Sequence, residues 1–463
     1  MSDFKSQINV AEFLDLPQKI IGSTDNEAYR RVLTLAWPAV GEQLLNMAIG
    51  LVDTFLVGHL GAEAVAAVGL ANQAVLLATV FFASVAVGVT ALVARHIGAR
   101  EPDQARVILH QGYLIGAVVG LFTMALGFSL AVPTMQVLQS PPEVIEYGAT
   151  YLRIVSLTFL LASWMFIGNA ALRGSGDTRT PMLVMLAVNV VNIVVAAVTI
   201  YGLGPIPPLG VAGSALGAAA GRGAGGLAVT FVLLRGRGSL RLKLSQLVPD
   251  LVQLKRILNI GLPAGVEQLF MRLGFMTFTM TVAALGTKAF AAHQLALQGE
   301  SISYMPGFGF AAAATTLTGQ GLGARDPQRA KSDAQLAQRL AVLSMCIMGV
   351  VFFTFAPQII GLFIQDPEVI ALGVWPLRLV AFSQPMLATS MVLSGALRGA
   401  GDTRSTLVIT SGGLWLVRVP LALWLAPWHG LIGAWIAMGV DLNLRGLACW
   451  LRFRSGRWAQ VQV

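Results

Sequence analysis

The chain has 463 residues, of which 56% are hydrophobic and 11% are charged, and its formal net charge is +9. This composition excludes a water-soluble globule, because a chain this apolar cannot cover its surface with polar side chains. Apolar runs such as residues 74–94 are long enough to cross a hydrocarbon core of ~30 Å as helices. We therefore predict an all-α polytopic membrane protein.

Twelve transmembrane helices are predicted from these runs and from the turn-forming residues between them. In chain order they cover residues 31–57, 65–93, 106–132, 147–171, 181–203, 209–234, 256–282, 290–319, 330–356, 372–396, 405–427 and 430–453. The N-terminal segment is polar and lacks an apolar stretch of signal-peptide length, so we expect the first span to act as the targeting element. The predicted organisation is an N-terminal segment (1–30), a six-helix lobe (31–235), a linker (236–255), a second six-helix lobe (256–453) and a tail (454–463).

A long internal repeat joins the two predicted lobes. The phrase ALRGSGDTR at 171–179 returns as ALRGAGDTR at 396–404, which is an offset of 225 residues. The same offset carries Pro38 onto Pro263 and Glu42 onto Glu267 without a gap. The chain is therefore predicted to be a duplicated six-helix unit. Because six is even, both lobes enter the bilayer in the same orientation, and we expect an axis along the membrane normal with a cavity between the lobes.

The repeated phrase also has a local interpretation. Gly174 and Gly176 are placed to end the fourth span, and Asp177 or Thr178 to begin the next. Two roles are open for the arginines of the phrases: they face the lipid headgroups, or they pair with Asp177 and Asp402. A substrate-binding role for the loop is the weaker alternative.

The basic residues indicate the orientation of the chain. Arginines and lysines gather on one side of the twelve-span arrangement, while the short connections of the other side contain Lys288 and several acidic residues. The positive-inside rule then places both termini in the cytoplasm, in a bacterial inner membrane. This topology explains the net charge of +9 without nucleic acid, so no nucleic-acid partner is expected.

Several motifs resemble one transporter family. They are LAWPAVGEQLLNMAIGLVDTFLVGHLGAEAVAAVGLANQ at 35–73, GAREP at 98–102, the paired ALRGxGDTR phrases and VRVPLALWL at 417–425. Across nearly the whole chain the sequence resembles the multidrug and toxic compound extrusion (MATE) family, and the aspartate of LVDTFLVG suggests its DinF-like branch. The resemblance implies a V-shaped fold of two lobes. It also implies an antiporter that exports organic, often cationic compounds in exchange for protons or sodium ions.

Asp53 is the main candidate for cation coupling, because a carboxylate within hydrocarbon is costly and usually functional. It lies five residues before the outer end of the first span, and Asn46 falls on the same helical face. The 225-residue offset places Phe278 opposite Asp53, so the carboxylate belongs to the N-terminal lobe alone. Asn189 and Asn192 of the fifth span are candidate partners. The alternatives are that Asp53 reaches interfacial water and that the asparagines only join helices.

The fifth span departs from the family pattern, in which DinF-like members carry an asparagine and an aspartate four residues later. This chain reads NIVVA, with Ala196 in place of the acid. A sodium site needs several oxygen ligands, whereas one buried carboxylate is enough to take up and release a proton. The sequence therefore favours coupling to protons over coupling to sodium ions.

Other intramembrane charges have two interpretations. Arg418, Asp441 and Arg445 are predicted to form a structural ion pair, because Asp441 lies at the depth of Arg418 and one turn from Arg445. The equivalent positions of Glu42 and Glu267 suggest a role in the scaffold of each lobe.

Glu42 and Glu267 are also candidates for the substrate cavity, together with Glu300, Tyr304 and Met276. Glu300 has Arg272 as a possible partner. We expect a monomer whose lobes rock about the linker at 236–255, opening the cavity to each side in turn.

An enzyme is not expected, because the five histidines show no metal-ligand spacing and no nucleophile motif is present. No cofactor or metal is predicted. The two cysteines, Cys346 and Cys449, lie in apolar runs, which is typical of packing residues. The alternative function is a flippase for lipid-linked precursors, which more than twelve spans or an arginine-dominated cavity would favour. A channel is less consistent with the sequence, which shows no filter-like ring.

Overall fold

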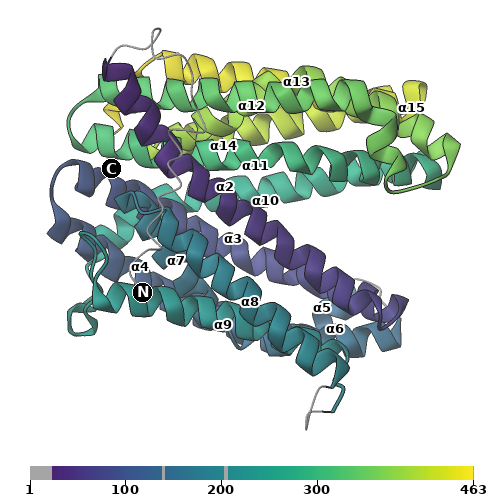
Figure 1. Ribbon diagram of the computed structural model, residues 1–463, viewed down its shortest axis with the longest axis horizontal. Coiled ribbons are helices and arrows are strands. Elements are labelled where there is room, and N and C mark those ends of the chain that lie inside the picture. Colours follow the sequence, from purple (N-terminus) through teal and green to yellow (C-terminus); the bar gives the residue numbers. More distant parts are fainter. Residues whose placement is uncertain (1–22, 138–140, 203–206, 462–463) are drawn as a thin grey trace, which may run out of the picture.

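A computed structural model describes residues 23–137, 141–202 and 207–461, so residues 1–22 of the predicted N-terminal segment lie outside the described part. Within that part the chain is helical and contains no β-strand (Figure 1). The helices of the first lobe are α2 (Ser23–Gly58), α3 (Ala62–Gly98), α4 (Pro102–Ser129), α5 (Ala131–Val137), α6 (Pro142–Ser156), α7 (Phe159–Ser175), α8 (Arg179–Tyr201) and α9 (Val211–Arg235).

The second lobe begins with α10 directly after the linker. Its helices are α10 (Leu251–Ala283), α11 (Thr287–Gly323), α12 (Pro327–Gly361), α13 (Pro367–Gly399), α14 (Thr403–Gly412), the π-helical segment η2 (Gly413–Arg418) and α15 (Val419–Arg454). Two short 3₁₀ turns, η1 (Leu244–Gln246) and η3 (Arg457–Gln460), lie in the linker and in the tail.

The described helices account for twelve membrane passes. Eight stretches are long and apolar enough to cross a bilayer, and α6 and α7 form a ninth span bent by 55°. One of the eight, Thr403–Arg454, has 52 residues and crosses twice, because Gly430 breaks it with φ 59°. With α10 and α11, which are 33 and 37 residues long, the two lobes have six passes each. The predicted fold class is confirmed.

Glycines at every fourth position determine how α9 packs. Gly213, Gly217, Gly221 and Gly225 form one ridge, and a Cβ added to any of the four would come within 2.4–3.0 Å of a neighbouring atom. Three of them contact α8 and the fourth contacts both α8 and α7. Small residues at this spacing allow two helix backbones to approach closely within a membrane. The glycine-rich stretch of the sequence therefore fastens α9 to its own lobe.

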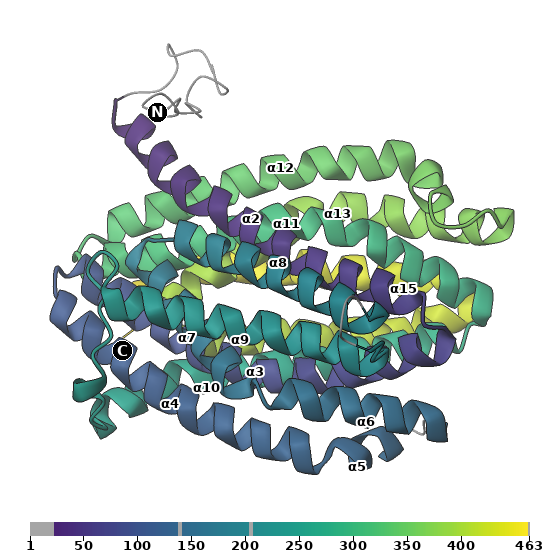
Figure 2. The ribbon, with the colours of Figure 1, turned by 60° about the horizontal axis from the view of Figure 1, so that its bottom comes forward.

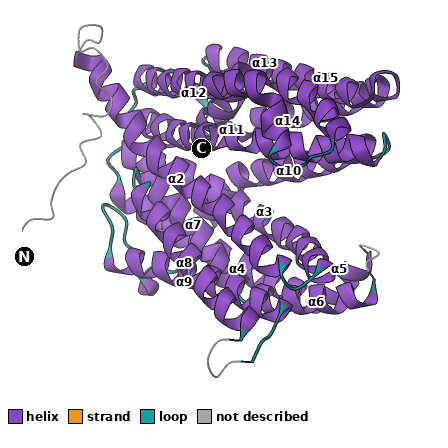
Figure 3. Cartoon of the chain, turned by 45° about the vertical axis from the view of Figure 1, so that its right-hand side comes forward, coloured by secondary structure: helices purple, strands orange, loops and turns teal. Residues whose placement is uncertain are grey.

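The first two helices of each lobe form the boundary between the lobes. Helix α2 packs against α8 of its own lobe and against α11 of the other, while α3 packs against both α10 and α11. In Figure 1, α2 crosses diagonally from the second lobe toward α5 and α6. The ribbons of the two lobes meet at the end of the bundle where the chain enters α2, and they diverge toward the other end (Figure 3). This arrangement is the expected V shape.

The linker between the lobes is attached to the first lobe. Leu240 and Leu242 are buried in its core. His110 Nε2 of α4 accepts a hydrogen bond from the backbone N–H of Lys243 (2.9 Å), and Gln111 Nε2 donates to the carbonyl of Val248 (2.8 Å). Helix α10 also begins at Leu251, four residues before the predicted end of the linker. Most of the segment that connects the lobes is therefore held against the first lobe by burial and hydrogen bonds.

Candidate functional site

Asp53 lies in a buried polar cluster inside the first lobe. Its residue is 7% exposed, and its Oδ1 has no hydrogen-bond partner. The amide of Asn192, on α8, lies near the carboxylate and acts on it. Asn192 is itself 1% exposed, and its Oδ1 is also unpartnered. Helices α2 and α8 thus bring an acid and an amide together, and one acceptor oxygen of each has no hydrogen-bond partner.

Arg222 completes this cluster, and sequence reasoning missed it. The residue lies on α9 within the glycine-rich stretch, one position after Gly221, which packs against Asn192. Its charge acts on Asp53 and on Tyr151 of α6. The signal was a lone arginine in an otherwise apolar span, which is a functional candidate by default.

The position that would hold a second acid is closed by packing. Ala196 is fully buried on α8, and a Cβ at Gly217 of α9 would lie 2.5 Å from the Ala196 Cβ. Helix α9 thus packs directly against residue 196, and this position carries no carboxylate. The cluster around Asp53 therefore contains one carboxylate and one arginine.

The other two amides predicted to serve Asp53 are placed differently. Asn189 is buried, and its Nδ2 donates to the backbone carbonyls of Met185 (2.8 Å) and Leu45 (3.1 Å). The second of these bonds joins α8 to α2 near the lobe boundary. Asn46 is exposed on α2. Of the three amides, Asn192 is the one that the structure brings to the carboxylate.

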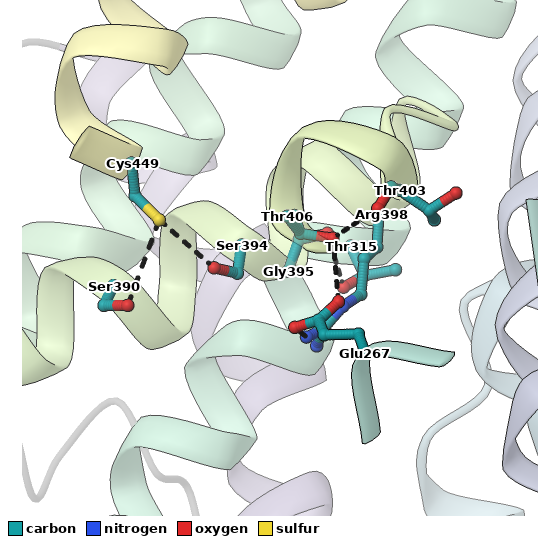
Figure 4. A network of polar contacts seen from close by, with 9 residues as sticks. All are labelled: Glu267, Thr315, Ser390, Ser394, Gly395, Arg398, Thr403, Thr406 and Cys449. Atoms are coloured by element: carbon teal, nitrogen blue, oxygen red, sulfur yellow. Dashed lines mark hydrogen bonds and ion pairs between the residues drawn. The ribbon is translucent and has the colours of Figure 1, made fainter. Parts of the chain in front are cut away.

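Glu42 and Glu267 form the same ion pair in the two lobes. Arg173 Nη1 donates to Glu42 Oε1 at 2.7 Å, and Arg398 Nη2 donates to Glu267 Oε1 at 2.6 Å. Thr406 Oγ1 also donates to Glu267 Oε2 (2.9 Å), as Figure 4 shows. The arginines of the repeated phrase thus hold the glutamates of the first helix in each lobe.

The aspartates of the repeated phrase accept hydrogen bonds from residues other than its arginines, which argues against the second of the two roles left open for those arginines. Asp177 accepts from Thr180 and from Arg237 Nε (2.9 Å), and Asp402 accepts from Arg452 Nε (2.8 Å). Burial raises the pKa of Asp177, but its hydrogen bonds from Thr180 and Arg237 outweigh that effect and leave the pKa below its ordinary value. As predicted, a glycine ends the helix: Gly176 has φ 96° after α7.

A second buried charge cluster lies in the other lobe. Arg418 Nε donates to Asp441 Oδ2 at 2.8 Å, and Arg445 Nη2 donates to the same oxygen at 2.6 Å. Asp441 is fully buried. The guanidinium of Arg418 also lies over the rings of Phe275 (5.4 Å) and Phe278 (5.5 Å), so the residue that replaces Asp53 in the repeat supports an arginine.

Glu300 belongs to the same cluster. It is fully buried on α11, close to Tyr304 one turn later, and the charge of Arg418 acts on it. Arg418, rather than the possible partner Arg272, is thus the cation that acts on Glu300. Met276 is exposed on α10.

Polar contacts between the lobes lie toward one end of the bundle. We call this end the basic end, because it contains the repeated phrases. There Thr316 Oγ1 donates to the Arg173 carbonyl (3.0 Å), and Gln320 Nε2 donates to the Gly174 carbonyl (3.1 Å). An ion pair joins Arg31 Nη2 of α2 to Asp333 Oδ1 of α12 at 2.8 Å. The lobes are therefore fastened together at the basic end.

The described residues contain no group of three or more histidine, cysteine, aspartate or glutamate side chains that is placed to hold a metal ion. Cys449 is buried with its Sγ 3.4 Å from Ser394 Oγ, and Cys346 is partly buried. Both thiols are free.

Comparison with known proteins places this fold in one family. The MatE family model matches residues 38–198 and 263–424, once in each lobe. A relative from Thermotoga maritima, described as "Probable multidrug resistance protein NorM", is 31% identical over 440 residues and covers 94% of each chain. "Multidrug resistance protein MdtK" of Yersinia pseudotuberculosis is 27% identical, over 94% of this chain and 96% of the relative.

The fold also matches a solved structure titled as the outward-facing conformation of a multidrug resistance MATE family transporter. The TM-score is 0.87 at 23% identity, with 94% of this chain and 96% of that chain covered. Members of the matched family are transporters rather than enzymes. The two family matches, the whole-length relative and the shared fold together show that this chain is a multi-pass membrane transporter of the MatE family.

Proposed function

We propose that the protein is a secondary antiporter that exports organic, cationic or amphipathic compounds and is driven by inward proton movement. The names of the NorM and MdtK relatives support multidrug efflux as the activity. The observation that carries the coupling proposal is the burial of Asp53 in one lobe, in a cluster that the other lobe does not repeat. The position of Asp53 in the first span supports assignment to the DinF-like branch of the family.

The composition of the cluster favours protons over sodium ions. A sodium site needs several oxygen ligands, and charged oxygens strengthen it. Here Ala196 is closed in by Gly217, and Arg222 already supplies a positive charge beside Asp53. A proton needs a single carboxylate oxygen, and Asp53 Oδ1 is available for it.

The exchange requires proton and substrate to weaken each other's binding. Ionised Asp53 attracts a cationic substrate and accepts a hydrogen bond from Asn192; protonation removes the charge and with it the attraction. The neutral form allows α2 to repack, and Gly50 is a suitable point of bending, because open space surrounds it. The substrate then leaves as the proton enters.

Alternating access follows from the lobe arrangement. We assign the basic end to the cytoplasm by the positive-inside rule, with both termini inside and the protein in a bacterial inner membrane. The lobes 31–235 and 256–453 then rock as units, with the linker at 236–255 between them. The ion pair of Arg31 and Asp333 closes the cytoplasmic side in the conformation described here, and its opening releases α2 from α12. We expect the transporter to work as a monomer.

The decisive experiment is transport of a fluorescent organic cation in proteoliposomes. Uptake or release is measured under an imposed pH gradient and, separately, under an imposed sodium gradient. We expect the pH gradient to drive transport and Asp53→Asn to abolish it while the variant keeps its melting temperature. Asp441→Asn is the control: it leaves Arg418 and Arg445 without their acid, so it should lower stability more than coupling.

Two results would overturn the proposal. Transport driven by sodium alone would remove the proton from the mechanism. Full gradient-driven transport by Asp53→Asn would move coupling to another acid, with Glu300 next because of its burial. The flippase alternative gains no support from the span count, since the described residues form twelve passes.

A further inference from the structure

A small basic cavity lies between the first turns of α12 and the last turns of α15. It has a volume of about 170 Å³ and is lined by Lys331, Gln335, Gln338, Trp450, Phe453 and Arg454. The lining thus contains two cations, two amides and two aromatic rings, and no carboxylate. The guanidinium of Arg454 lies 5.0 Å from the centre of the Trp450 ring, which directs this charge along the aromatic face.

A second, apolar groove lies nearer the middle of the same lobe, between α13 and α15. Its volume is about 380 Å³, and its lining includes Leu379, Phe382, Ile436, Val440 and Leu444. Two polar residues of the lining pair with each other, since Asn443 Nδ2 donates to Ser383 Oγ (3.0 Å). The groove therefore offers an aliphatic or aromatic surface without a free charge.

One face of α15 joins the two cavities. Ile436, Val440, Leu444, Leu447 and Leu451 are all exposed, and their spacing of three or four residues keeps them on a single stripe. Helix α15 lies directly on α13 here, since a Cβ at Gly446 would come 2.5 Å from the Met386 carbonyl oxygen. The stripe thus follows the contact between α13 and α15 from the apolar groove to the basic cavity.

We propose that the cavity, the stripe and the groove form one binding site for an anionic phospholipid. The headgroup phosphate lies between Lys331 and Arg454, and one acyl chain follows α15 into the groove. The six residue steps from Leu444 to Trp450 span ~9 Å at ~1.5 Å per residue. One leaflet of hydrocarbon is about 15 Å thick, half of a ~30 Å core, so an acyl chain that starts at the cavity reaches the groove.

The position and size of the cavity favour a lipid over other anions or a drug. It lies where α12 begins and α15 ends, which is the cytoplasmic membrane surface in the orientation proposed above. Basic residues at this surface attract anionic headgroups, and tryptophan is enriched at the same level. A volume of 170 Å³ is below the usual range for drug-sized ligands. The site rests on the orientation and is independent of which ion drives transport.

The test uses the full chain in detergent and phosphatidylglycerol with brominated acyl chains, which quenches nearby tryptophans. We expect quenching with a saturable component that disappears in Trp450→Phe. Lys331→Gln combined with Arg454→Gln should weaken the apparent affinity roughly tenfold or more, because each basic residue near anionic lipid contributes substantially to binding. The matched control is Lys255→Gln with Arg404→Gln, two exposed basic residues outside the cavity lining, which should leave the affinity within about twofold.

The other outcomes each contradict a part of the proposal. Equal quenching by brominated phosphatidylcholine means that the apolar stripe and groove bind any lipid, and that Lys331 and Arg454 do not select an anionic headgroup. Competition by inorganic phosphate at millimolar concentration means that the cavity takes a free anion instead of a lipid headgroup. An equal loss of affinity in the control variant means that general surface charge, rather than this cavity, attracts the lipid. Because transport is not measured, these outcomes are separate from those that test the antiporter.

Discussion

Arg173 Nη1 lies 2.7 Å from Glu42 Oε1, and this ion pair joins the end of α7 to the middle of α2 within one lobe. Arg398 and Glu267 repeat it 225 residues later, between α13 and α10. In both lobes the glutamate comes from the helix that also crosses the lobe boundary. The repeated phrase therefore ties each boundary helix to its own lobe, so that the lobes move as units.

Removing either glutamate should destabilise its lobe. We expect Glu42→Gln to lower the free energy of unfolding by about 1–3 kcal/mol, below the range for fully buried pairs because the Arg173 side chain is 22% exposed. Glu267→Gln should cost more, because Glu267 also accepts from Thr406. Melting temperatures in detergent measure both effects. Equal stability of wild type and both variants would show that the repeated pair is not structural.

The glycine ridge of α9 gives a second prediction. Gly217→Ala places a methyl group 2.5 Å from the Ala196 Cβ, so α8 and α9 must separate, and we expect a loss of about 1–3 kcal/mol. Gly223→Ala is the matched control on the same helix, because its nearest neighbour would be 3.7 Å away. Thermal unfolding should distinguish the two variants. If Gly217→Ala is as stable as Gly223→Ala, the close approach of α8 and α9 is not required.

The number of spans and the two-lobe architecture were predictable, because the length of each apolar run and the repeat offset can be read directly from the sequence. Apolar runs of sufficient length gave twelve spans, and a gapless offset of 225 residues gave two equivalent lobes. Boundaries were less accurate: α2 begins at Ser23 rather than at residue 31, because the helix continues beyond the apolar stretch.

The polar clusters were only partly predictable, because pairing between distant helices depends on packing that a single sequence does not show. Asp53 and Asn192 were identified by their charge and polarity within apolar spans. Arg222 was not predicted, because the residues on which its charge acts, Asp53 and Tyr151, lie on other helices. The partner of Arg173 was deducible in principle, since the repeat duplicates both the arginine and Glu42. The nearby Asp177, one of the alternatives left open, accepts instead from the start of the next helix, as is typical of a residue just before a helix.

Arg222 should determine which cation the cluster accepts. Arg222→Gln leaves Asp53 as the one formal charge among the cluster residues named above, so we expect an imposed sodium gradient to begin to drive transport in this variant. Arg222→Lys keeps the positive charge and should stay insensitive to sodium. Proteoliposome flux with each gradient makes the comparison. Sodium insensitivity of a folded, membrane-inserted Arg222→Gln protein would show that the arginine does not exclude the metal ion.

The ion pair between Arg31 and Asp333 should hold the basic end closed. Asp333 is 1% exposed and accepts from Arg31 across the lobe boundary, so Asp333→Asn weakens a contact that exists in one conformation and must break in the other. We expect a shift toward the state open at the basic end by about 1 kcal/mol, or roughly fivefold in population, because Arg31 is partly exposed. Spin labels at the exposed positions 104 and 328, with Cys346 and Cys449 replaced by serine, report the distance between the lobes.

Arg329 supplies the control for this experiment. Its Nε lies 3.7 Å from Asp333 Oδ2, but it belongs to the same helix, so Arg329→Gln removes a cation from Asp333 without breaking a contact between lobes. The label distances should then remain those of the wild type, while Arg31→Gln should reproduce the shift seen with Asp333→Asn. If Arg329→Gln moves the distances as far as Arg31→Gln does, the charge balance at Asp333 governs the conformation. The contact across the lobe boundary would then not be the element that closes the basic end.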